Sequence, residues 1–124
     1  MPVRSLNSSV LKWPDRDQVD HAVRDWAARV EPNRRGIVAL GYFGSYARGD
    51  WGVGSDLDLI MILDHTDQCF ERRALSWDLT ELPVPASLLV YTLQEWERLR
   101  QEGGRFVRTV ERETLWVFKK IDRR

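Results

Sequence analysis

Two acids, Asp56 and Asp58, stand directly before the apolar residues 59–63, and this placement constrains the chain more than any other feature. Side chains two positions apart in a β-strand point to the same face, about 6.5 Å from each other. The two carboxylates therefore project together, and burying such a pair is costly unless something neutralises it. Mg²⁺ prefers oxygen ligands and completes its shell with water and phosphate oxygens. The pair predicts a metal and phosphate site; the alternative is a turn capped by Ser55 and Asp56, with Asp58 at a solvated strand end.

A second feature lies upstream, where Gly44 and Ser45 follow an apolar run over residues 36–43. A glycine turn that leads into a helix lets backbone N–H groups approach an anion, and the helix start adds its positive dipole end. Ser45 supplies a hydroxyl donor, and Arg48, one turn on, supplies a cation. This turn is therefore expected to bind phosphate beside the two acids. Trp51, in the loop that follows, is a candidate for stacking on a base or on a partner.

The pattern along the chain predicts a small mixed sheet with helices packed against it, an α+β fold. Periodic apolar residues, capping residues and prolines predict helices, and short β-branched or aromatic runs predict strands buried on both faces. Helices are expected over 15–30, 46–48, 68–82, 92–103 and around 106–110, and strands over 36–43, 58–63, 86–91 and 115–118.

Length and composition favour one globular domain over residues 1–124, with its core at about 15–118. The 19 basic and 19 acidic residues leave no overall field for nucleic acid or a membrane, and no apolar stretch approaches a membrane span. A cytoplasmic location is expected, and self-association stays open. Cys69 is the only cysteine, which excludes a disulfide within these residues, and it is expected to be buried.

The stretch GSYARGDWGVGSDLDLIMIL resembles the signature of the DNA polymerase β-like nucleotidyltransferase superfamily: Gly-Ser, ten residues, Asp-x-Asp. It is most similar to the minimal nucleotidyltransferases of bacteria and archaea. The likeness includes the segment Ala47-Arg48-Gly49 and Ser55 before the first acid, and it extends more weakly through PVPASLLVYTLQEW and RFVRTVERETLWVF. The resemblance implies the palm-like fold of that superfamily.

The resemblance also implies roles for particular residues. Gly44, Ser45, Arg48 and Ser55 would contact a nucleoside triphosphate, with ATP favoured, and the catalytic pair Asp56 and Asp58 would bind Mg²⁺ bridged to its phosphates. An acceptor hydroxyl would attack the α-phosphate, and pyrophosphate would leave. Positioning and neutralisation of charge would carry most of the catalysis.

One position departs from the family pattern. The family has a third carboxylate on the neighbouring strand, and alignment on ASLLVYT places Ser87 there. A serine hydroxyl is neutral and cannot replace the charge of the acid or act readily as a general base. No acid occurs from Pro83 to Leu93, and Asp78 and Glu81 are the nearest acids before this strand. Nucleotide binding therefore needs only the pair, whereas Ser87 decides whether transfer follows.

Two functions remain. The first is Mg²⁺-dependent transfer of AMP from ATP to a hydroxyl of a partner protein or another acceptor. Minimal nucleotidyltransferases pair with small helical HEPN-type proteins, so the resemblance implies the antitoxin half of a toxin-antitoxin pair. The second is a catalytically weakened module that binds nucleotide and acts by contacting a helical partner, which Ser87 favours.

Overall fold

A computed structural model describes residues 13–30 and 36–120. Its strands are β1 (Ile37–Phe43), β2 (Leu57–Leu63), β3 (Ala86–Thr92) and β4 (Leu115–Lys119). They form one sheet in the order β3-β2-β1-β4, in which β1 runs antiparallel to both of its neighbours and β2 runs parallel to β3. The mixed sheet and the α+β class expected from the sequence are therefore confirmed.

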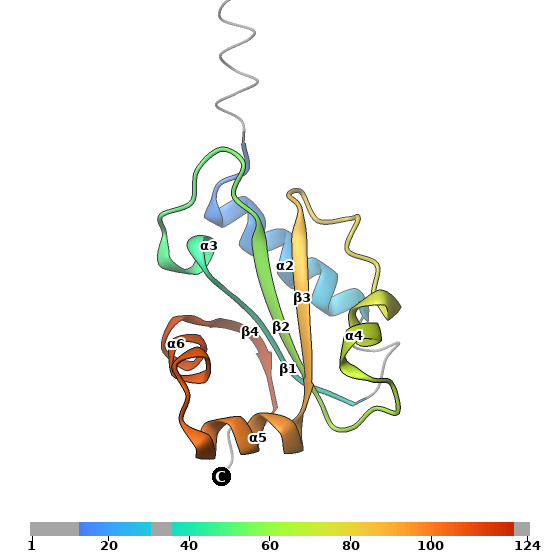
Figure 1. Cartoon of the computed structure of the whole chain (residues 1–124). Helices are drawn as coiled ribbons and strands as arrows, with labels where there is room; N and C mark the ends of the chain where they lie inside the picture. Colours follow the sequence, from blue (N-terminus) through green and yellow to red (C-terminus); the bar gives the residue numbers. More distant parts are fainter. Residues whose placement is uncertain (1–12, 31–35, 121–124) are drawn as a thin grey trace, which may run out of the picture.

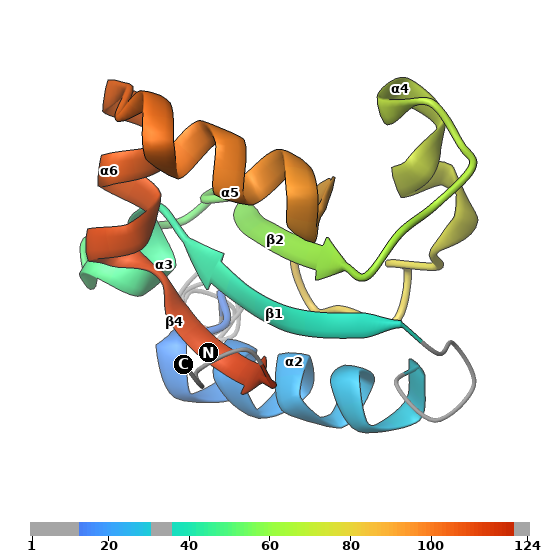
Figure 2. The same cartoon turned by 90° about the horizontal axis from the view of Figure 1, so that it is seen from below.

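The helices lie on both faces of this sheet. They are α2 (Arg16–Val30), α3 (Ser45–Arg48), α4 (Phe70–Arg73), α5 (Leu93–Glu102) and α6 (Arg105–Glu113), with a 3-10 turn, η1, at Ala74–Ser76. Figure 1 shows α3 at one end of the sheet and α5 at the other. Figure 2 shows α2 against one face, with α5 and α6 against the opposite face.

Capping boxes start the two long helices where the sequence places them. Before α2, the Asp15 carboxylate accepts the backbone N–H of Gln18 at 2.9 Å, and the Gln18 side chain accepts the N–H of Asp15 at 3.0 Å. Before α5, Thr92 and Glu95 exchange the same pair of hydrogen bonds. Each box satisfies two N–H groups that a helix start otherwise leaves without a partner.

The alternation of β2 builds a core on each side of the sheet. Leu57, Leu59 and Met61 belong to the cluster beneath α2, whereas Ile60 and Ile62 belong to the cluster beneath α5 and α6. Both faces of this strand are therefore covered, as its continuous apolar run predicts. Because side chains alternate along a strand, Asp58 lies on the same face as Ile60 and Ile62, beyond the part of that face that α5 and α6 cover.

The helix expected over 68–82 is wrong in its extent, because helical structure ends at Ser76. Trp77 is extended, and the Asp78 carboxylate accepts both the N–H and the hydroxyl of Thr80, a local pattern that competes with helix formation. Leu82 lies outside any helix but still packs into the core beneath α2.

The expectation for Cys69 is also wrong, since this residue is exposed immediately before α4. Among the described residues, no helix is long and apolar enough to cross a membrane.

Candidate active site

Gly44 holds the turn between β1 and α3 against the second acid of the pair. Its φ of 81° and ψ of −155° lie in a region that is essentially restricted to glycine. A Cβ at this position would lie 2.3 Å from Oδ2 of Asp58, so a larger residue would collide with the carboxylate. Backbone and carboxylate thus meet directly, and the turn and the acid, fourteen positions apart in the sequence, form one site.

Asp58 lies between one residue of β1 and one of β3. In the antiparallel pair it stands opposite Phe43, and in the parallel pair it stands opposite Ser87. Asp56 precedes the first residue of β2 and is exposed. Ser87, which the sequence alignment assigns to the position of the third carboxylate of the superfamily, therefore lies beside Asp58.

The electrostatics of Asp58 match this placement. Burial raises the pKa of the Asp58 carboxyl, the carboxylate of Asp56 raises it further, and the guanidinium of Arg48 lowers it in part. Ionised Asp58 is therefore disfavoured by its surroundings within the chain. A cation bound to the carboxylates would reverse that balance, because an opposite charge favours the ionised form.

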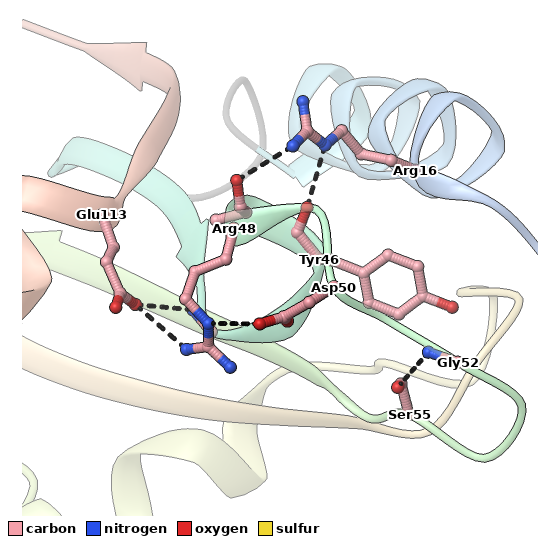
Figure 3. A network of polar contacts seen from close by, with 9 residues as sticks. Arg16, Tyr46, Arg48, Asp50, Gly52, Ser55 and Glu113 are labelled. Atoms are coloured by element: carbon pink, nitrogen blue, oxygen red, sulfur yellow. Dashed lines mark hydrogen bonds and ion pairs between the residues drawn. The ribbon is translucent and has the colours of Figure 1, made fainter.

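Arg48 lies at the end of α3 between two acids (Figure 3). Its guanidinium is 3.1 Å from the Asp50 carboxylate and 3.5 Å from the carboxylate of Glu113, the last residue of α6. The hydrogen bond from Arg48 to Asp50 and the charge of Glu113 raise the pKa of Arg48. The same Glu113 oxygen accepts the backbone N–H of Gly44 at 3.3 Å.

Contacts from α2 and from the following loop hold α3 in place. Arg16 donates to the backbone oxygens of Tyr46 and Ala47, at 2.9 and 3.1 Å, and so satisfies two carbonyls of α3. The buried Tyr46 donates its hydroxyl to Pro14, and its ring stacks on Trp51 at 5.7 Å. Trp51, considered from the sequence for a base or a partner, thus packs within the chain.

The remaining predicted site residues, Ser45 and Ser55, lie at the two turns that flank the site. Ser45 begins α3, next to Gly44, and is partly buried. The hydroxyl of Ser55 accepts the backbone N–H of Gly52 at 2.8 Å and closes the turn that precedes Asp56 (Figure 3). Contacts of Ser45 and Ser55 with a triphosphate stay predictions.

Glu113 and Arg16 are site residues that sequence reasoning missed. Neither belongs to a local motif, and Glu113 lies 69 positions from the glycine whose N–H it accepts. Asp78 and Glu81, considered as substitutes for the third acid, are engaged elsewhere: Asp78 with Thr80, and Glu81 in an ion pair with Arg29 of α2. Only the folded chain reveals these partners.

The residues present fit one divalent cation that is bound partly by the protein and partly by the phosphates of a nucleotide. Asp56 and Asp58 supply the oxygen donors that Mg²⁺ prefers, and burial, together with the carboxylate of Asp56, raises the pKa of Asp58. Within residues 13–30 and 36–120, no group of three or more His, Cys, Asp or Glu side chains is arranged to hold a metal. The fit is therefore to a metal that takes its other ligands from phosphate and water.

The comparison with protein families gives the class of this protein. Residues 27–118 match the family described as nucleotidyltransferase domain, and the chain belongs to that family. The resemblance drawn from the Gly-Ser and Asp-x-Asp spacing is confirmed. A search of the curated protein sequences finds no match to the chain.

Solved structures share the fold at low sequence identity. One, from Sulfolobus solfataricus, is of a protein assigned to the nucleotidyltransferases; it has a TM-score of 0.61 and 14% identity, with 86% of each chain covered. Another is a crystal structure of a toxin-antitoxin with AMP-PNP; it has a TM-score of 0.52 and 16% identity, over 81% of this chain and 73% of that chain. These likenesses concern the fold and agree with a minimal nucleotidyltransferase.

Proposed function

We propose that the protein transfers AMP from ATP to a hydroxyl of a partner protein or of another acceptor, with Mg²⁺ held by Asp56 and Asp58. We further propose that it acts as the antitoxin of a toxin-antitoxin pair whose other member is a helical, HEPN-type protein. The family supports nucleotidyl transfer, and the similarity to a toxin-antitoxin with AMP-PNP supports a partner protein and a nucleotide. A cytoplasmic location belongs to the same proposal.

The observation that carries this proposal is the contact between the Gly44 turn and the Asp58 carboxylate. A Cβ on Gly44 would lie 2.3 Å from Asp58 Oδ2, so the glycine turn lies directly against a carboxylate whose pKa is raised. We propose that this turn binds the triphosphate. Perturbed carboxylates of this kind concentrate at functional sites. Mg²⁺ bound there would neutralise the carboxylates and the phosphate oxygens together.

In the proposed reaction the acceptor oxygen forms a bond to the α-phosphorus of ATP. The bond from that phosphorus to the bridging oxygen of the β-phosphate breaks, pyrophosphate leaves with the bonding electrons, and the hydroxyl proton passes to solvent. The backbone at Gly44, the hydroxyl of Ser45 and the cation of Arg48 would orient the triphosphate. Their contribution is to position it and to offset its charge.

The test is transfer of label from ATP, in the presence of Mg²⁺, to the proteins encoded by the genes on either side of this one. Wild type should label the acceptor, and Asp56→Asn combined with Asp58→Asn should reduce labelling by at least about 100-fold, the scale expected when electrostatic stabilisation is removed. Asp64→Asn is the matched control, because Asp64 is exposed and follows the other end of β2. Labelling that survives loss of the pair would exclude this mechanism.

A second function has a specific observation in its favour. Ser87 lies opposite Asp58 in the parallel pair of β2 and β3, and the sequence alignment assigns it to the position of the third acid of the superfamily. A chain that lacks this acid would bind Mg²⁺ and nucleotide and neutralise its partner by contact alone. Calorimetric binding of ATP by wild type without any label transfer is the result expected from this module.

The variant Ser87→Asp separates the two functions. Ser87 is exposed on an edge strand, so an aspartate can be accommodated without repacking the core. If the missing acid limits transfer, this variant should label the acceptor at least about tenfold faster than wild type, within the range for general acid–base groups. Gln94→Glu, at an exposed position beyond the other end of the same strand, is the control for added charge. An unchanged or lower rate in Ser87→Asp would exclude the missing acid as the limitation.

A further inference from the structure

Glu113 brings a negative charge to the groups that the proposed function assigns to phosphate. Its carboxylate accepts the N–H of Gly44 at 3.3 Å and lies 3.5 Å from the guanidinium of Arg48. Its side chain is only 16% exposed, whereas that of Arg48 is 47% exposed. A partly buried carboxylate thus occupies a backbone donor and a cation of the candidate triphosphate site.

The position of Glu113 follows from packing at the end of α6. The next residue, Thr114, is buried, and Leu115 pairs with Tyr42 of β1. Gly41 permits this approach, because a Cβ there would lie 2.7 Å from the backbone oxygen of Leu115 and from a methyl group of Thr114. The backbone that follows α6 is therefore held close to β1, so displacement of the carboxylate requires rotation of the Glu113 side chain.

A carboxylate and a phosphate cannot use the same donors at once. The N–H of Gly44 is a single donor, and Glu113 approaches it with the charge of an anion. Arg48 is shared in addition with Asp50, at 3.1 Å. An incoming triphosphate at Gly44 must therefore displace Glu113, and two anions side by side would repel each other.

We propose that Glu113 is an internal competitor of the triphosphate and sets the affinity of the site for it. This inference rests on the proposed function, since it concerns the same nucleotide. The apparent dissociation constant of a ligand is its intrinsic constant divided by the fraction of molecules that are competent to bind. Removal of the Glu113 charge should raise that fraction and tighten binding.

The experiment is calorimetric titration of ATP, and separately of inorganic triphosphate, in Mg²⁺ buffer into wild type and Glu113→Gln. Glutamine keeps the shape and removes the charge, and binding of both ligands should tighten about fivefold, as expected if the competitor holds the site in most molecules. Glu113→Asp keeps the charge but shortens its reach, and it should also tighten binding. Adenosine, which has no phosphate, should be unaffected by either change.

Glu111→Gln is the matched control. Glu111 lies on the same helix, is 41% exposed and pairs with Arg100 rather than with Gly44 or Arg48. It removes the same unit of charge without freeing the site, so nucleotide affinity should stay as in wild type. Equal tightening in Glu111→Gln and Glu113→Gln would overturn the proposal in favour of a general effect of net charge.

A spectroscopic measurement tests the contact independently of the variants. In protein labelled with ¹⁵N-glycine, ATP and Mg²⁺ should shift the amide resonance of Gly44, because its N–H changes partner. The chain has 8 glycines, which keeps this spectrum simple. Binding by calorimetry with an unmoved Gly44 resonance would overturn the proposal.

The outcomes separate this inference from the proposed function. If wild type binds ATP and Glu113→Gln binds it equally or more weakly, the inference fails and the proposed function stands. If neither protein binds ATP, the nucleotide role fails and the inference fails with it. Binding by Glu113→Gln that is tighter than in wild type, with Glu111→Gln unchanged, supports both.

Discussion

The surroundings of a carboxylate differ between the two ends of the sheet: they favour the ionised form of Glu95 and disfavour that of Asp58. At the end of β3, the buried Arg73 donates to both oxygens of Glu95, at 2.7 and 3.0 Å, and to the backbone oxygens of Val90 and Gln68. The hydrogen bond from Arg73 lowers the pKa of Glu95. At the start of β2, burial and the neighbouring carboxylate raise the pKa of Asp58.

The two ends therefore differ in whether the charged side chains are paired with the opposite charge within the chain. Arg73 and Glu95 neutralise each other, and Glu95 also accepts the N–H of Thr92 in the capping box of α5. Asp56 and Asp58 have the same sign, and Arg48, which lowers the Asp58 pKa, is shared with two other acids. Asp58 is partly buried beside a carboxylate of the same sign, and this incomplete compensation is unfavourable for the ionised carboxylate.

The largest effect on stability is expected from Gly44→Ala. The positive φ and the collision with the Asp58 carboxylate should together lower the free energy of unfolding by about 3 kcal/mol. Addition of Asp58→Ala should restore part of this loss, because it removes the collision and leaves the backbone strain. Denaturant unfolding of the single and double variants measures both terms.

Gly52→Ala is the control for this substitution. A Cβ at Gly52 would meet nothing within 4 Å, and its φ is not positive, so stability should change by less than about 0.5 kcal/mol. An equal loss in Gly44→Ala and Gly52→Ala would contradict a specific contact between the turn and Asp58.

At the other end of the sheet, Arg73→Met should lower the free energy of unfolding by about 2 kcal/mol. The change leaves the Glu95 carboxylate without its cation and the Val90 carbonyl without the Arg73 donor. Arg100→Met is the matched control, because Arg100 pairs with Glu97 and Glu111 at the surface, where such pairs contribute about 0 to 1 kcal/mol. Equal losses of unfolding free energy in Arg73→Met and Arg100→Met would contradict a difference between the partly buried pair and the surface pairs.

The opposite sign is expected for Asp58→Asn, which should raise the free energy of unfolding at pH 7 by about 1 kcal/mol. A folded-state pKa above the unfolded value contributes stability at low pH that is lost as pH rises through the folded pKa. At pH 7 the ionised Asp58 is therefore unfavourable, and the gain from asparagine should shrink below about pH 4, the usual pKa of aspartate. Asp64→Asn, at the other end of β2, should show no such gain.

Glu95 should show the reverse dependence on pH. Its pKa is lowered, so its contribution is present above its unfolded value and is lost as pH falls through the folded pKa. Urea unfolding between about pH 2 and 7 measures this loss. The free energy of unfolding of Glu95→Gln should fall less on acidification than that of wild type, because glutamine does not titrate whereas glutamate has an ordinary pKa of about 4.3. The same slope in both proteins would contradict the pairing with Arg73.

The smallest effect is stabilisation by Mg²⁺ alone. Binding to the folded state adds about 0.4 kcal/mol when the free Mg²⁺ concentration equals its dissociation constant. Wild type should gain this in thermal unfolding, whereas Asp56→Asn with Asp58→Asn should not. NaCl of equal ionic strength controls for screening. Equal gains in both proteins would place the cation elsewhere.

Much of the fold and part of the candidate site could be predicted because the signals are local. The strand, turn, loop and strand over residues 37–63 are continuous, and the apolar runs and the glycine of the turn are visible in sequence. The parallel register that places Ser87 opposite Asp58 agrees with the alignment made on ASLLVYT. The prediction of a helix over 68–82 was wrong because, after Ser76, the Asp78 side chain forms local hydrogen bonds with Thr80 that compete with a helix.

By itself, the sequence determined the class of the protein, the order of its strands and helices along the chain, and the pair of acids at the head of a buried strand. Only the tertiary structure decided which charges neutralise each other. It pairs Arg73 with Glu95, brings Glu113 to Gly44 across 69 positions and places the Gly44 turn against Asp58. The physical reason is that spacing along one strand sets which side chains share a face, whereas the charge balance depends on residues that packing of the helices and sheet brings together.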